Sequence, residues 1–372
     1  MAVKCQTIIE VMEQLAPKSL AEQWDNVGLQ IGHPRADIQK VLVSLDLTEE
    51  VIQEAIAHGA NMIITHHPFI FQPLKHIRWD LPTGRLIKEL IQHEIVLYAA
   101  HTNLDIAQQG LNDMLAQKLS LQNIEILSQT GQEKLYKIVV FVPKGHEEQI
   151  RDVLSNKGAG WIGNYSHCTF QTPGTGTFKP LEGTNPFIGN IGKIEYTQEY
   201  RLETIVPQSD LSKVIKAMIK AHPYEEVAYD IYPLENQGKV FGIGRIGNLQ
   251  QPISYEDFLQ SIKNILNINR LRLSGPIPSS IKRVALCTGS GAQFMHQAAR
   301  QGGDVYITGD VKYHEAQQAK DLGICLIDAG HFATEVIVIE GLKNYLDAAF
   351  IRDKRDVQVI SSKVNKDFFE WK

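Results

Sequence analysis

Histidines and carboxylates near the ends of predicted strands are the residues with the clearest chemical potential in this sequence. His66 and His67 follow the strand-like segment NMIIT, and Pro68 breaks that strand, so both imidazoles can turn toward one cavity. His331 and Glu335 lie four residues apart, a spacing that brings two side chains to one face of a helical turn. Because imidazole and carboxylate bind zinc, iron and manganese, the pattern points to metal chemistry.

Asp105 adds a further carboxylate by the same pattern. The segment from His101 to Asp105 follows a predicted strand, as the segment from His331 to Glu335 does, and each has the form His-x-x-x-acid. The candidate ligands are thus His66, His67, Asp105, His331 and Glu335. These ligands are too many for one tetrahedral ion and too few to fill every coordination position of two ions. The set therefore fits a dinuclear site with a bridging carboxylate and open positions for water. A set of unrelated polar residues is the alternative that spacing alone leaves open.

Several nearby polar residues have more than one interpretation. His101 is a candidate metal ligand, a donor that orients a carboxylate, or the acid or base that moves a proton; a structural strand-end histidine is the alternative. Asp310 is a candidate lining residue, but we interpret it as a solvated loop acid. Asp25 and Asn26 in WDNVG either contact substrate or form a turn, and a turn is enough to explain them.

A strand–helix–strand unit is predicted to position the first histidines. The segment 41–47, VLVSLDL, is apolar and β-branched and is predicted to be a strand. Thr48 then caps a helix with Glu49 and Glu50 in its first turn, and Gly59 ends that helix before NMIIT. This order indicates a parallel or mixed sheet, and ligands gather at the carboxyl ends of the strands in such sheets.

The same unit recurs in the last third of the chain. The segment that begins at Arg283 aligns without gaps to the one that begins at Lys40. The identical pairs are Val41 with Val284, Ala55 with Ala298, Gly59 with Gly302, Ile64 with Ile307 and Thr65 with Thr308. We interpret the two segments as the halves of one pseudo-duplicated α/β metal-binding domain.

Between the halves, the predicted elements take the order β-α-β-β-α-β, which is ferredoxin-like. We therefore predict an α/β domain that is interrupted by a ferredoxin-like α+β insert, since insertion at a surface loop costs little stability. Residues 1–130 are the first half of the metal-binding domain, 131–237 the inserted domain, and 238–372 the second half.

Three further motifs are assigned no cofactor. Residues 242–247 match G-x-G-x-x-G, but no helix follows at once and no acid ends a second strand, so a dinucleotide site is rejected. PGTGTF (173–178) lacks the lysine of a P-loop and is interpreted as a flexible hairpin or loop. HPYEE (222–226) either holds a second metal or ends a helix, and the helix-ending turn is favoured.

Composition narrows the classes of function. The 372 residues carry 37 Lys and Arg against 42 Asp and Glu, and the net charge of -5 disfavours nucleic acid or an anionic membrane as partner. The 4 cysteines lie far apart, which argues against a disulfide framework and suits a reducing compartment. The sequence has neither a signal-peptide pattern nor a long apolar run, so we expect a cytoplasmic protein.

With WDNVGLQIG, ITHHPFIF, AAHTNLD and DAGHFATE in this order, the chain resembles the dinuclear metal-centre hexamer family, the GTP cyclohydrolase I type 2 homologues. The resemblance spans the whole length. The insert, which contains GTGTF and HPYEE, resembles the PII/CutA-like domain of the longer bacterial members. The resemblance implies two divalent metal ions per chain, with zinc expected and iron or manganese as the other choices. Their ligands would be His66, His67, Asp105, His331 and Glu335.

The resemblance also implies a homohexamer whose sites face an internal cavity, and hydrolysis of a nucleotide. The expected reaction opens the imidazole ring of GTP with release of formate, and we assign the proton transfer to His101. The alternative function is a non-catalytic metal-binding or regulatory hexameric scaffold. The PII/CutA-like insert motivates this alternative, since such folds often sense small ligands.

Overall fold

The computed structural model describes residues 2–370, which form a mixed α/β fold with several sheets, as the sequence predicts. Two compact units are present: the residues up to Thr130 together with those from Phe241 onward, and Gly131–Val240. Within residues 2–370, no helix combines the length and the apolar character that crossing a bilayer requires.

The first sheet of the larger unit is mostly parallel and has the order β17-β4-β5-β6-β2. Strands β17, β4, β5 and β6 run parallel, and β2 is antiparallel to β6. Helices α2 (Glu49–His58) and α3 (Pro82–Gln92) connect the central strands. The strands are β2 (Gly28–Ile31), β4 (Lys40–Ser44), β5 (Met62–Thr65), β6 (Val96–Ala99) and β17 (Gln358–Ser361).

The second sheet of this unit has the order β13-β16-β15-β14-β12-β7. Its three central strands, β14 to β16, are parallel, while β12 is antiparallel to β14 and β13 is antiparallel to β16. Its strands are β7 (Gln122–Gln132), β12 (Val240–Ile253), β13 (Arg272–Ser274), β14 (Ile281–Ser290), β15 (Val305–Gly309) and β16 (Cys325–Asp328). Helices α9 (Met295–Arg300) and α10 (Tyr313–Leu322) connect the parallel strands. A separate two-stranded sheet pairs β1 (Val3–Lys4) with β3 (Asp37–Ile38).

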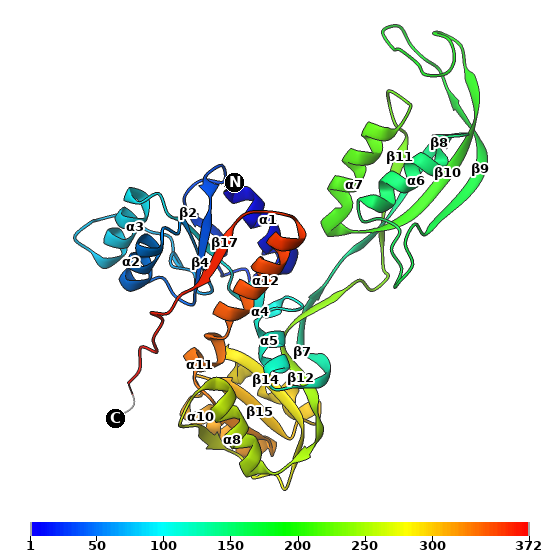
Figure 1. Ribbon diagram of the computed structural model, residues 1–372. Helices are drawn as coiled ribbons and strands as arrows, with labels where there is room; N and C mark the ends of the chain where they lie inside the picture. Colours follow the sequence, from blue (N-terminus) through cyan, green and yellow to red (C-terminus); the bar gives the residue numbers. More distant parts are fainter. Residues whose placement is uncertain (1, 371–372) are drawn as a thin grey trace. The chain divides into compact units, whose positions relative to one another are not determined.

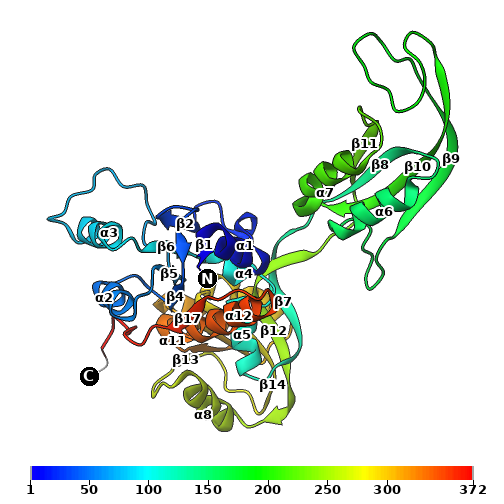
Figure 2. The ribbon, with the colours of Figure 1, turned by 45° about the horizontal axis from the view of Figure 1, so that its top comes forward.

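One hydrophobic core joins the two sheets of the larger unit. It contains buried residues of β4, β5 and β6 and of β14, β15 and β16, together with residues of four long helices. Figures 1 and 2 both show α5 and α12 between the two sheets. These helices are α1 (Cys5–Leu15), α5 (Leu111–Lys118), α8 (Tyr255–Leu266) and α12 (Val338–Arg352). The shared core fixes the carboxyl ends of the two parallel strand sets in one rigid unit.

The connection from β4 to α2 differs from the prediction in one respect. The Ser44 hydroxyl donates a hydrogen bond to the Asp46 carbonyl at 2.7 Å, and β4 ends at Ser44. The predicted strand 41–47 is therefore too long, because this turn removes the last residues from the sheet. The helix cap is confirmed, since Oγ1 of Thr48 accepts from the Val51 amide and Gly59 ends α2 at a φ of 65°.

The smaller unit is a four-stranded antiparallel sheet with two helices. Its sheet order is β11-β8-β10-β9, with α6 after β8 and α7 after β10. The bounds are β8 (Leu135–Pro143), α6 (Glu147–Asn156), β9 (Thr169–Phe178), β10 (Glu195–Pro207), α7 (Gln208–Ala221) and β11 (Tyr229–Leu234). Apolar residues of both helices and of β8 and β10 form one core, and Figure 1 shows the helices on one face of the sheet. PGTGTF lies inside β9 and pairs with the antiparallel strand β10, so it belongs to a hairpin, the first of its two interpretations, and is not a loop.

Candidate metal centre

The predicted ligand residues lie just beyond the carboxyl ends of strands in the larger unit. His66 and His67 follow β5 directly. Asp105 lies on the short helix α4 (Thr102–Ile106) after β6, and His331 and Glu335 lie on α11 (His331–Glu335) after β16. The two sheets therefore contribute side chains to one cluster.

His66 is buried, and the backbone sets the orientation of its ring. Its Nδ1 lies 2.8 Å from the Ala100 carbonyl oxygen, and because a carbonyl only accepts, Nδ1 carries the proton. The lone pair on Nε2 faces the cluster, 3.7 Å from Oδ1 of Asp105 and 3.9 Å from Oε1 of Glu335. Burial lowers the pKa of His66 to about 3. The ring is therefore neutral at physiological pH, the form in which imidazole binds a metal.

The Glu335 carboxylate lies at the centre of the cluster. Its Oε2 is 2.9 Å from Nε2 of His67 and 2.9 Å from Nε2 of His331. Burial opposes ionisation, but hydrogen bonds from these two histidines hold the pKa of Glu335 well below its usual value. Gly289 in β14 makes room for it, because a Cβ at this position would overlap the carboxylate. The φ of Gly289, 61°, is also in the left-handed region that favours glycine.

Two aspartates bind the outer nitrogens of the same histidines. Oδ1 of Asp46 lies 2.7 Å from Nδ1 of His67, and Oδ2 of Asp310 lies 2.7 Å from Nδ1 of His331. Against the effect of burial, Asp46 and Glu335 raise the pKa of His67 to about 10. Hydrogen bonding to Glu335 also outweighs burial at His331 and, with Asp310, raises its pKa to about 9. A carboxylate at Nδ1 fixes the ring and directs Nε2 toward the cluster, as is usual for metal-ligating histidines.

The donor set fits divalent cations. Nε2 of His66 and Oδ1 of Asp105 are buried and have no hydrogen-bond partner among the described residues. Both atoms offer lone pairs, and a cation is the group that satisfies two such atoms 3.7 Å apart. Two groups of side chains place their ligand atoms within 4.8 Å of one another: His66, His67 and His101, and His67, His331 and Glu335. Burial and the nearby Glu335 raise the pKa of Asp105 to about 7, as expected for carboxylates that share one site.

His101 adjoins the cluster and is held by an aspartate from the N-terminal segment. Its Nδ1 lies 3.0 Å from Oδ1 of Asp25, and the Thr102 amide donates to Oδ2 of Asp25 at 3.0 Å. Burial favours the neutral acid, but the hydrogen bonds from His101 and Thr102 lower the pKa of Asp25 to about 2. The His101 ring centroid is 5.2 Å from that of His66. Asp25 therefore orients His101 beside the ligand atoms.

The structure brings the predicted site residues together and adds residues that the sequence analysis missed. Asp46 was not recognised because the predicted strand 41–47 includes it. In the structure it follows the end of the buried strand β4, just as His66 follows the end of β5. Asp310 is an exposed acid just after β15, as interpreted from the sequence, but it also binds Nδ1 of His331. Asp25 does more than form a turn, since it binds His101 through contacts that no local pattern reveals.

The motif HPYEE lies in the smaller unit, away from this cluster in the sequence. Nε2 of His222 lies 3.1 Å from the Phe141 carbonyl oxygen, and Nδ1 accepts from the Tyr224 amide at 3.1 Å. Both ring nitrogens are thus occupied within the turn that follows α7. The motif ends a helix, as favoured from the sequence, and His222 offers no free nitrogen to a metal.

Comparison with known proteins gives one consistent result. The model of the Duf34/NIF3 (NGG1p interacting factor 3) family matches residues 3–368. A protein of Halalkalibacterium halodurans named GTP cyclohydrolase 1 type 2 homolog is 48% identical over 366 residues, 98% of each chain. A protein of Bacillus subtilis with the same name is 46% identical over 370 residues, 100% of this chain and 99% of the relative. The crystal structure of a Bacillus cereus protein related to NIF3 superposes with a TM-score of 0.92 at 44% identity, covering 100% of both chains.

Proposed function

Because the chain belongs to the DUF34/NIF3 family, as its motifs predict, we propose that it is a hydrolase that uses two divalent metal ions and acts on a purine nucleotide such as GTP. One observation carries the proposal: the unpartnered, buried atoms Nε2 of His66 and Oδ1 of Asp105 converge beside the Glu335 carboxylate. The names of the relatives support the choice of substrate.

The proposed ligands divide into two sets that share one carboxylate. His66 faces Oε1 of Glu335 and Oδ1 of Asp105, whereas His67 and His331 contact Oε2 of Glu335. Glu335, whose two oxygens face both sets, would help to hold the ions, and zinc is the expected metal. Bound divalent ions would supply Lewis-acid activation of the substrate and of water. The protein contributes the fixed positions of the ligand atoms, because Ala100, Asp46 and Asp310 hold the outer nitrogens of the histidines.

An exposed aromatic surface beside the site supports a planar substrate. Trp24 is 58% exposed, and its ring centroid lies 6.1 Å from that of His101 and 5.9 Å from that of Phe71. An indole with a free face stacks readily on a nucleobase. We infer that Trp24 holds the purine next to the metal ligands.

The proposed reaction removes C8 of the purine as formate. Two water molecules are consumed, both bonds from C8 to ring nitrogens break, and the nitrogens take up protons. We assign the proton transfer to His101, which Asp25 orients through Nδ1. The replacement His101→Gln separates this role from that of a ligand, since a proton carrier can be lost without loss of bound metal.

We also propose the finer architecture. The larger unit consists of two diverged copies, which the shared parallel order of β4-β5-β6 and β14-β15-β16 supports. The smaller unit is a ferredoxin-like insert, supported by its strand order and its two helices. A homohexamer is proposed on the family resemblance alone, and the mass of the protein in solution tests it.

The test of function is formate release from GTP by the zinc-loaded protein. The wild type and Glu125→Gln should release formate, because Glu125 is exposed and remote from the ligand cluster. Glu335→Gln should lose at least about 100-fold in rate, as expected when a metal ligand is removed. Absence of formate from the zinc-, iron- and manganese-loaded wild type would leave the non-catalytic scaffold as the better account.

A further inference from the structure

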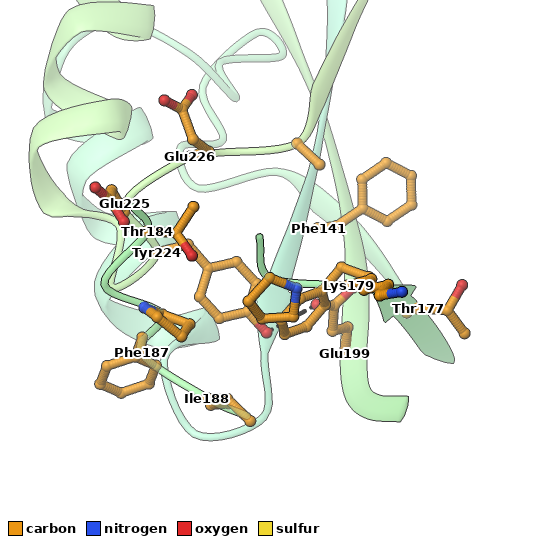
Figure 3. Close-up of a pocket in the computed structure, with 15 residues that line it drawn as sticks. Phe141, Thr177, Lys179, Thr184, Phe187, Ile188, Glu199, Tyr224, Glu225 and Glu226 are labelled. Carbon is orange, nitrogen blue, oxygen red and sulfur yellow. Dashed lines mark hydrogen bonds between the residues drawn. The ribbon is translucent and has the colours of Figure 1, made fainter. Parts of the chain in front are cut away.

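The smaller unit contains a pocket with a volume of about 380 Å³. All residues that line it belong to this unit, and they include parts of both PGTGTF and HPYEE. Figure 3 shows that it lies between the ends of the sheet strands and the segments that follow α7 and β9. The volume falls in the range of small-molecule sites.

Aromatic rings form the apolar part of this pocket. The Tyr224 ring has Phe178 at a centroid distance of 6.0 Å and Phe187 at 6.3 Å. Phe187 is 53% exposed and stands in the loop between β9 and β10. Rings tilted around an open space suit a flat apolar body, which can contact them by face or by edge.

The polar part of the pocket is a buried carboxylate, Glu199. Glu199 is 9% exposed, and its Oε1 accepts a hydrogen bond from the Tyr224 hydroxyl at 2.8 Å. A Cβ at Gly176 on the neighbouring strand would overlap the carboxylate, so the glycine of GTGTF allows Glu199 to lie flat against β9. Nearby basic residues are paired elsewhere: Lys137 and Arg201 form ion pairs with Glu203, and Lys213 with Asp210. None of these three is the partner of Glu199, although buried carboxylates are normally paired.

The other charges of the pocket favour a cation over an anion. Glu225 and Glu226 also line it, and Lys179 is the single basic residue in its lining. The Glu225 carboxylate accepts the Asn185 amide at 2.9 Å, and both nitrogens of His222 are bonded within the turn. A chelated metal ion is therefore a poor match, whereas one positive group opposite one buried carboxylate is a good one.

We propose that this pocket binds an organic ammonium ion with a flat aromatic body, the ammonium group pairing with Glu199 and the body lying among the aromatic rings. The site is separate from the metal centre in sequence and in unit, and it goes beyond the proposed hydrolysis. It uses the two motifs of the insert, GTGTF and HPYEE, that the metal centre leaves without a role.

Isothermal titration of the full-length protein with tryptamine tests this proposal. Tryptamine presents an ammonium group and an indole, and indole-3-propionate presents the same ring with a negative charge. The wild type should bind tryptamine and not the propionate. Glu199→Gln keeps the shape and the hydrogen bond from Tyr224 but removes the charge, and it should weaken tryptamine binding by about tenfold or more, the usual loss for a charge-assisted contact. The matched control Glu182→Gln, at an exposed position in the loop between β9 and β10, should bind like the wild type.

A second variant keeps the proposal testable if Glu199→Gln fails to fold. Phe187→Ala removes an exposed ring from the pocket wall, and it should weaken tryptamine while leaving the thermal midpoint unchanged. Equal binding of tryptamine and indole-3-propionate would overturn the proposal. So would absence of tryptamine binding at millimolar concentration, or equal affinities of Glu199→Gln and Glu182→Gln.

Discussion

Asp46 offers a test of the metal centre without touching a proposed ligand. Its carboxylate is 24% exposed and lies 2.7 Å from Nδ1 of His67, which is itself 25% exposed. The contact holds the ring through Nδ1 and therefore keeps Nε2 directed at the cluster. Asp46→Asn retains an oxygen acceptor at nearly the same position but removes the negative charge, so it isolates the electrostatic contribution of the contact.

The expected loss follows from the strength and the exposure of this contact. Carboxylates that orient a metal-ligating histidine are worth about 10- to 100-fold in metal affinity. Because the pair is one-quarter exposed and the asparagine oxygen can still accept the hydrogen bond from Nδ1, we expect the lower end, about tenfold. Asp310 makes the same contact to His331 at 2.7 Å but is 47% exposed, so Asp310→Asn should cost less, about threefold.

Competition with a chromophoric chelator measures zinc affinity for the wild type and the two variants. Asp37→Asn is the matched control, since Asp37 is 62% exposed and pairs with Lys4 far from the cluster in the sheet β1-β3. Zinc affinity within twofold of the wild type for Asp46→Asn would refute the idea that this aspartate orients His67. The reverse order, with Asp310→Asn the weaker binder, would refute the argument from exposure.

Three further predictions concern stability and packing. Arg245 donates two hydrogen bonds to the Asp113 carboxylate, each at 2.8 Å. Arg245→Met should lower the free energy of unfolding in urea by about 3–5 kcal/mol, because it leaves that carboxylate without its cation in the interior. A loss below about 1 kcal/mol would contradict this. Gly289→Ala should lower the zinc content, because a Cβ displaces Glu335; unchanged content would show that the strand adjusts freely. The pKa of Asp25 is about 2 in the folded protein, below its value in the unfolded chain. The roughly 2 kcal/mol of stability that this shift contributes is therefore present above pH 4 and is lost as the pH falls toward 2. The difference in unfolding free energy between the wild type and Asp25→Asn should shrink over that range, and a constant difference would refute the assignment.

The sequence predicted the parts of the site that follow from local order. His66 and His67 stand after an apolar strand, and the spacing of His331 and Glu335 matches a helical turn, so both pairs could be placed from periodicity alone. Strand ends also determine which edge of a sheet a residue occupies. The convergence of the two sheets was only an inference from the repeat and the family resemblance.

What could not be predicted were contacts that depend on tertiary packing. Asp25 binds His101 from 76 positions away, and no local pattern encodes that distance. The end of β4 depends on the Ser44 hydroxyl, which also binds Asn365 from the other end of the chain. Glycine and threonine in PGTGTF leave both a hairpin and a loop open locally, whereas the pairing of β9 with β10 puts this motif in a strand.

The metal content of the reconstituted protein is the most direct test of the central claim, that His66, His67, Asp105, His331 and Glu335 form a dinuclear centre. Elemental analysis after zinc loading and gel filtration should find two ions per chain in the wild type and in Glu125→Gln. It should find one ion or none per chain in Glu335→Gln, since the variant loses the carboxylate that faces His66 on one side and His67 and His331 on the other. A wild type without bound zinc, iron or manganese, or a Glu335→Gln protein that keeps two ions, would contradict the account.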